Sequence, residues 1–133
     1  MCGMETLTVI APDKIGLLLE VTTVLGKEKI NIESISLEVV GNKAIIRLIL
    51  EKGAVKKAKS LLEKAGFQVV ASDTLVIKLN DKPGELAKVA KILAESKVSI
   101  ESVHVIDKQN GKTLDAIKVD DAKKAEKLLR EYL

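Results

Sequence analysis

The chain has 133 residues, of which 47% are hydrophobic and 31% are charged, and its formal net charge is +3. This composition is typical of a folded globular protein and excludes intrinsic disorder. The small net charge gives no case for nucleic-acid binding. No apolar run is long enough to cross a bilayer, and the N-terminus lacks the layout of a signal peptide, so we expect a cytoplasmic protein without membrane contact. Cys2 is the only cysteine, which excludes an intramolecular disulfide.

An internal repeat dominates the sequence, and repeats of this kind decide the architecture. The segment Asp-Lys-Ile-Gly at residues 13–16 returns as Asp-Lys-Pro-Gly at residues 81–84. Likewise, Ile-Glu-Ser-Ile at residues 32–35 returns as Ile-Glu-Ser-Val at residues 100–103. The repeat predicts two tandem domains, residues 1–73 and residues 74–133.

The first copy alternates strand and helix patterns. Apolar alternation predicts a strand over residues 7–11, and a turn containing Asp13 and Gly16 leads into an amphipathic helix. The apolar stripe of that helix is predicted at Leu18, Val21 and Leu25. A hairpin with its turn at residues 41–43 then joins a strand carrying Ile35, Leu37 and Val39 to a strand over residues 44–51. A Lys-rich helix ending at Gly66 and a fourth strand over residues 67–71 complete the copy.

The second copy repeats this order up to its second helix. We expect a strand over residues 75–79, a helix with its stripe at Leu86, Val89 and Leu93, and a hairpin turning at residues 109–111. A strand over residues 113–119 and a helix reaching Leu133 follow, so this copy has no fourth strand of its own. Asp115 stands where the first copy has Ile46, on the face predicted to point into the core, and the pattern offers no explanation for it.

The order βαββαβ predicts an α+β fold of two ferredoxin-like units, each an antiparallel sheet with both helices on one face. A copy of this size is marginally stable alone. The uncovered edge of the second sheet also invites pairing with another strand. We therefore expect the copies to pack together and the chain to form a homodimer.

The ferredoxin-like layout hosts many functions, so function must be argued from side chains. Aromatic residues that could stack RNA bases are missing from the predicted central strands. The single histidine, His104, is too little for a metal site or for a catalytic pair in both copies. We therefore predict that the protein is not an enzyme and has no metal or other cofactor.

The repeated segment resembles the ACT domain, the regulatory module of many enzymes of amino-acid metabolism. That family typically shows Asp-x-Pro-Gly-x-Leu after the first strand and Asn-Ile at the second strand. The second copy matches the first element in full at residues 81–86. The first copy has Ile15 in place of proline but keeps Asn31-Ile32, where the second copy has Ser99-Ile100. The resemblance implies that an amino-acid effector binds at this loop.

Physical chemistry supports the same place. A glycine lets a ligand approach the backbone, and the free amides at a helix N-terminus attract a carboxylate. Asp13 or Asp81 could hold an ammonium group, although both could instead act only as helix N-caps, and each glycine could serve only the turn. The predicted ligand-binding residues are Asp13, Lys14, Ile15, Gly16, Leu17, Asn31, Ile32, Asp81, Lys82, Pro83, Gly84, Glu85, Ser99 and Ile100.

The sequence thus predicts a non-catalytic regulatory protein that binds an amino-acid effector and has an enzyme as a further candidate partner. An alternative interpretation is a protein–protein interaction or oligomerisation module that regulates an enzyme of amino-acid metabolism without its own ligand. It is motivated by apolar residues on the predicted outer face of the first sheet, namely Ile10, Ile32, Val40, Ile45 and Ile49.

Overall fold

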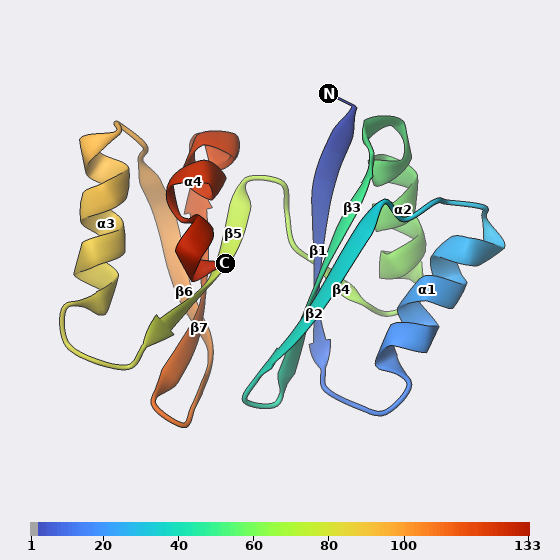
Figure 1. Cartoon of the computed structure of the whole chain (residues 1–133), viewed down its shortest axis with the longest axis horizontal. Helices are drawn as coiled ribbons and strands as arrows, with labels where there is room; N and C mark the ends of the chain where they lie inside the picture. Colours follow the sequence, from blue (N-terminus) through green and yellow to red (C-terminus); the bar gives the residue numbers. More distant parts are fainter. Residues whose placement is uncertain (1–2) are drawn as a thin grey trace. The chain divides into compact units, whose positions relative to one another are not determined.

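The computed structural model describes residues 3–133, so Cys2 lies outside the described residues. The chain divides after Val70 into two compact units, unit 1 and unit 2 (Ala71–Leu133), drawn in Figure 1. The boundary predicted between residues 73 and 74 falls at the start of the first strand of unit 2.

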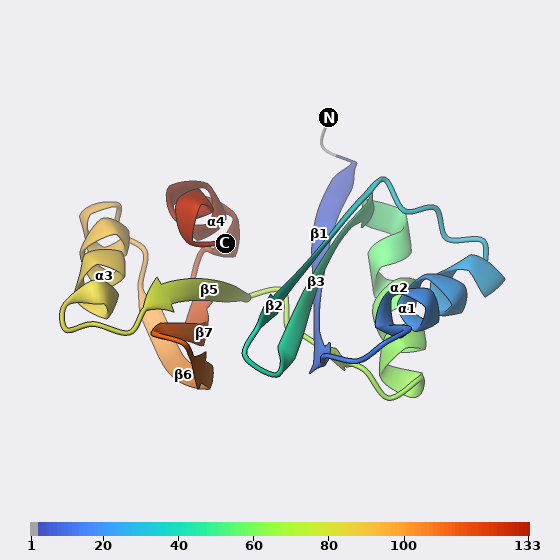
Figure 2. The ribbon, with the colours of Figure 1, turned by 60° about the horizontal axis from the view of Figure 1, so that its bottom comes forward.

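Unit 1 follows the order βαββαβ. Its elements are β1 (Met4–Pro12), α1 (Leu17–Lys27), β2 (Ser34–Val40), β3 (Lys43–Glu51), α2 (Lys52–Lys64) and β4 (Gln68–Val69). The sheet has the order β2-β3-β1-β4, and every pair of neighbours is antiparallel. Both helices cover one face of the sheet, as Figures 1 and 2 show. The predicted ferredoxin-like fold is therefore confirmed.

The core of unit 1 forms between the helices and alternate residues of the strands, because successive strand residues point to opposite faces. Leu7, Val9 and Ile46 are among the buried strand residues. The predicted helical stripe is right at Val21 and Leu25 and wrong at Leu18. Leu17, Val21 and Leu25 are the buried residues of α1, whereas Leu18 is 43% exposed. Ile32, predicted on the outer face, in fact packs against this core.

Unit 2 has the same order without its last strand. Its elements are β5 (Thr74–Asn80), α3 (Glu85–Glu95), β6 (Ile100–Gln109), β7 (Lys112–Val119), α4 (Ala122–Leu128) and a 3₁₀ turn (Arg130–Tyr132). The sheet is antiparallel with the order β5-β7-β6, which confirms the predicted lack of a fourth strand. Tyr132 and Leu133 instead pack against the core of this unit.

The predicted turns are confirmed, and backbone geometry explains them. Two-residue loops join β2 to β3 and β6 to β7, and such tight hairpins need positive φ angles. Gly41 has φ 62°, while Asn110 and Gly111 have φ 54° and 76°. Gly66, with φ 94°, follows α2 as predicted.

Apolar side chains remain exposed on the edge strands. Ile35, Leu37 and Val39 of β2 pair with core residues of β3 and therefore lie on the helix-facing side, yet they are 37–46% exposed. In unit 2, Val103 and Val105 of β6 are 37% and 54% exposed. The helices thus cover the inner strands and leave an apolar strip along one edge of each sheet.

Asp115 is the one carboxyl group buried among residues 3–133. It is 3% exposed and pairs with Ile77 of β5 and Val105 of β6, on the helix-facing side of β7. No donor in the described part of the chain bonds its Oδ1 atom. Burial raises the pKa of Asp115, and a hydrogen bond from the Thr113 side chain opposes this in part.

A buried acid with a raised pKa makes stability depend on pH. The protonated Asp115 contributes fully to the stability of the folded protein below pH 3.8, the ordinary pKa of the unfolded state. This contribution is lost as the pH rises through the raised pKa of the folded state. Since Asp115→Asn cannot titrate, we expect this variant to gain stability relative to the wild type as the pH rises from acidic to neutral. Urea unfolding of both proteins across that range measures the difference, and a constant or opposite trend would contradict it.

Candidate functional site

Each unit has its own candidate site at an equivalent bend, which joins the first strand of the unit to its first helix. In unit 1 the chain leaves β1 at Pro12, the Leu17 N–H donates to the Lys14 carbonyl at 3.3 Å, and Gly16 has φ 84°. In unit 2 the Glu85 N–H donates to the Lys82 carbonyl at 3.4 Å, and Gly84 has φ 88°. Residues 13–16 and 81–84 are called the first and the second bend.

The interpretation of Asp13 and Asp81 as helix N-caps, one of the two left open by the sequence, is wrong. The N-cap residues are Gly16 and Gly84, and neither helix has a side-chain cap. The reason is that a full turn separates each aspartate from its helix. The Asp13 N–H instead donates to the Asn42 carbonyl at 2.9 Å, and the Asp81 N–H donates to the Gly111 carbonyl at 2.8 Å. Each bend is therefore fastened to the hairpin turn of its own unit.

Both helices begin with unused backbone donors. In the described part of the chain, no acceptor bonds the second and third amides of either helix, those of Leu18 and Leu19 in α1 and of Leu86 and Ala87 in α3. No atom lies within 4 Å of the position that a Cβ would take at Gly16 or Gly84. These open amides, at the positive end of a helix dipole, form the kind of place where a carboxylate binds.

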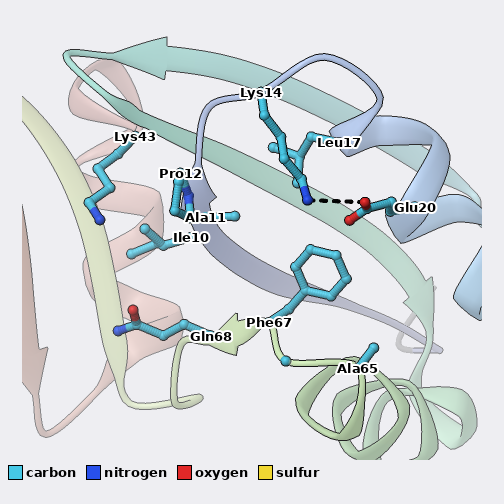
Figure 3. A pocket seen from close by; sticks show the side chains of 11 residues that line it. Ile10, Ala11, Pro12, Lys14, Leu17, Glu20, Lys43, Ala65, Phe67 and Gln68 are labelled. Atoms are coloured by element: carbon cyan, nitrogen blue, oxygen red, sulfur yellow. Dashed lines mark hydrogen bonds and ion pairs between the residues drawn. The ribbon is translucent and has the colours of Figure 1, made fainter.

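A hollow of about 320 Å³ adjoins the first bend. Figure 3 shows Lys14 reaching across it toward α1, where its Nζ atom lies 3.0 Å from Glu20 Oε1, with the Phe67 ring nearby. Lys14 and Leu17 are the predicted site residues that line the hollow. The other lining residues are Ile10, Ala11, Pro12, Glu20, Lys43, Ala65, Gly66, Phe67 and Gln68.

The remaining predicted residues of unit 1 are not gathered there. Ile15 is fully exposed. Asn31 and Ile32 follow the far end of α1, roughly 16 Å along the helix axis from Gly16. The Asn31 side chain donates from Nδ2 to Glu33 Oε2 at 2.9 Å. The structure of unit 1 therefore brings Asp13, Lys14, Gly16 and Leu17 together, but not Asn31.

Charged side chains surround the second bend. Asp81 Oδ1 lies 3.7 Å from Lys108 Nζ, and Glu85 Oε2 lies 2.8 Å from Lys88 Nζ. The hydrogen bond from Lys88 lowers the pKa of Glu85, and the same bond raises the pKa of Lys88. Lys82, Pro83 and Gly84 are exposed in the bend itself.

The last two predicted residues lie away from the second bend. The Ser99 N–H donates to Asp120 Oδ1 at 2.9 Å, beyond the far end of α3, and Ile100 packs against the core of unit 2. Like Asn31 and Ile32, they stand at the opposite end of the first helix from the bend.

Sequence reasoning missed Glu20 and Phe67 as neighbours of the first bend. Glu20 lies one helical turn beyond Gly16, a spacing that puts its side chain beside the bend. Phe67 directly follows the glycine that ends α2, which was itself recognised. The signal was therefore present, but the approach of the α2–β4 loop to the bend depends on tertiary packing.

Among residues 3–133, no group of three or more His, Cys, Asp or Glu side chains is placed to hold a metal ion. None of the helices in this range has the length and apolar character needed to cross a membrane.

Each unit is thus a small α+β module with an exposed glycine bend before its first helix. The ACT domain family matches the chain twice, at residues 6–66 and 74–132. The chain therefore belongs to the ACT domain family, whose members are regulatory domains, and its role is regulatory. No curated protein matches the chain.

Solved structures with similar folds include protein BT0572 from Bacteroides thetaiotaomicron, at 28% identity over 97% of this chain and 87% of that one, with a TM-score of 0.47. The ligand-free regulatory subunit of aspartate kinase from Thermus thermophilus shares 20% identity over 98% of this chain and 90% of its own, with a TM-score of 0.49. The ACT domain of prephenate dehydrogenase from Bacillus anthracis shares 28% identity over 50% of this chain and all of its own, with a TM-score of 0.46.

The left-handed backbone at the bend predicts a clear contrast between Gly16, which precedes α1, and Gly26, which lies within it. Gly16→Ala should destabilise the protein by about 1–2 kcal/mol, because a Cβ is strained at positive φ. Gly26→Ala is the matched control within the helix, where alanine should instead stabilise by up to about 1 kcal/mol. Urea unfolding measures both changes. Equal stability of the two variants would contradict the assigned conformation of Gly16.

Proposed function

We propose that this protein is a non-catalytic regulator that binds an amino-acid effector at the two bends. The observation that carries this proposal is the duplicated set of unbonded amides beside an open, left-handed glycine. An α-carboxylate is common to all amino acids and matches this backbone donor set without a dedicated cation. Membership of a regulatory family supports the same role.

The hollow at the first bend suits a small ligand. Its volume of about 320 Å³ lies at the lower end of the usual range for ligand pockets. Its lining carries charges of both signs, from Lys14 and Lys43 and from Glu20, which pairs with Lys14. Phe67 and Leu17 supply apolar surface. An amino acid, which carries both charges and a side chain, is complementary to such a lining.

A second candidate function is assembly, either as a homodimer or on an enzyme of amino-acid metabolism. The apolar strips on β2 and β6 favour it, because exposed valine, leucine and isoleucine next to an unpaired strand edge invite association. Effector binding and assembly are compatible, since a ligand that prefers one assembly shifts the equilibrium toward it. The cytoplasmic location predicted from the sequence remains part of this proposal.

Thermal unfolding with each of the twenty L-amino acids tests effector binding. At a concentration about 100 times its dissociation constant, a ligand adds about 2.7 kcal/mol of stability, which corresponds to a rise of several degrees in Tm. We expect at least one amino acid to raise Tm in this way.

The variants that test the site are Gly16→Ala and Gly84→Ala. Their added Cβ atoms enter the open space beside the free amides. The stabilising amino acid should raise Tm less in at least one of these variants than in the wild type. If millimolar concentrations of all twenty leave the Tm of the wild type unchanged, effector binding is ruled out. Light scattering of the free protein then decides whether assembly alone remains.

A further inference from the structure

Asp115 forms no salt bridge with any cation among residues 3–133. It is 3% exposed, and no donor among residues 3–133 bonds its Oδ1 atom. The charge of Lys108 acts on Asp115, but Lys108 Nζ lies 3.7 Å from Asp81 Oδ1 and is therefore matched to another carboxylate. A buried carboxyl with an unsatisfied oxygen is costly and calls for a partner.

The position of Asp115 connects it to the second bend. Thr113, two residues before it on the same face of β7, is 7% exposed and pairs with Leu79, close to the end of β5 where the bend begins. The charges of Asp81 and Lys108 both act on the Asp115 carboxyl. Thr113 and Asp115 thus form a polar pair on the core side of the sheet, leading inward from the bend.

The strand beside Asp115 is partly open to solvent. Val105, which lies opposite Asp115 in the β6–β7 register, is 54% exposed. The register of β6 also shifts between Val105 and Asp107, where an extra residue interrupts the regular pairing. The buried carboxyl group therefore lies next to a strand that is irregular and half-exposed.

No such group is buried in the described part of unit 1, residues 3–70. The position equivalent to Asp115 is Ile46, which is fully buried in an apolar core. The two units share the bend but differ in the one buried charge beneath it. A ligand-binding role that both bends share would not require Asp115, because unit 1 has Ile46 at that position. A role of Asp115 in binding must therefore be specific to unit 2.

We propose that Asp115 and Thr113 receive an ammonium group of the amino acid bound at the second bend, so that unit 2 recognises a cationic group that unit 1 does not. This inference rests on the proposed function and adds the chemical class of group recognised. The ammonium is either the α-amino group or the side-chain amino group of a basic amino acid. Both would supply the missing hydrogen bonds to Oδ1.

Isothermal titration of the full chain at neutral pH tests the inference. The probes are the twenty L-amino acids, the 2-hydroxy acid analogue of the tightest binder, and L-norleucine beside L-lysine. We expect Asp115→Asn and Asp115→Ile to weaken the tightest binder by at least roughly tenfold, because a hydrogen bond to a charged group is lost. Asp115→Ile copies the core of unit 1, so it should fold at least as stably as the wild type.

Ile46→Leu is the matched control at the equivalent position of unit 1, and it should leave the affinity unchanged. Weaker binding of the 2-hydroxy acid identifies the α-ammonium, and weaker binding of norleucine than of lysine identifies the side-chain ammonium. Unchanged affinity in both Asp115 variants would overturn the inference and leave the proposed function intact. If the wild type binds none of the amino acids, the proposed function and this inference fall together.

Discussion

The candidate site depends on one backbone constraint, the left-handed glycine that precedes each first helix. Within a few residues the chain must leave a strand and enter a helix that packs back on the same sheet. Gly16 and Gly84 make this turn at φ 84° and 88°, where a side chain would be strained. A glycine at the N-cap position has no side chain to cap the helix, so the first amides stay open. The requirement of the fold and the capacity to bind an anion therefore have the same origin.

The two units share this left-handed glycine but differ in the residues that lie beneath it. Beneath the first bend the core is apolar, with Leu17 and Ile46 both buried. In unit 2 the corresponding residues are Glu85, which is paired with Lys88, and Asp115, which has an unpartnered oxygen. Burying such a carboxyl lowers the stability of the unit, and copying the residue of unit 1 would remove that cost. The two bends are thus equivalent in backbone and different in chemistry.

The sequence predicts the fold well because strand and helix periodicity and the glycine turns act locally. The register of the repeat was enough to place both bends and both hairpins. Prediction from the sequence failed for features that depend on tertiary packing. The stripe of α1 begins at Leu17 instead of Leu18, although Val21 and Leu25 are buried as predicted. Sequence spacing alone did not place the helix starts at Leu17 and Glu85, after glycine N-caps. It also did not place Phe67 in the lining of the hollow beside the first bend.

The bend also has a physical connection to the surface that could receive a partner. In unit 1 the Asp13 amide is bonded to the Asn42 carbonyl in the turn between β2 and β3. That turn continues directly into β2, whose exposed Ile35, Leu37 and Val39 lie at the edge of the sheet. Unit 2 repeats the connection through Asp81 and Gly111 to β6. A ligand can shift an assembly equilibrium only through a difference in its contacts between two states. A bend held by one hydrogen bond to the hairpin that presents the apolar edge provides a direct means for such a difference.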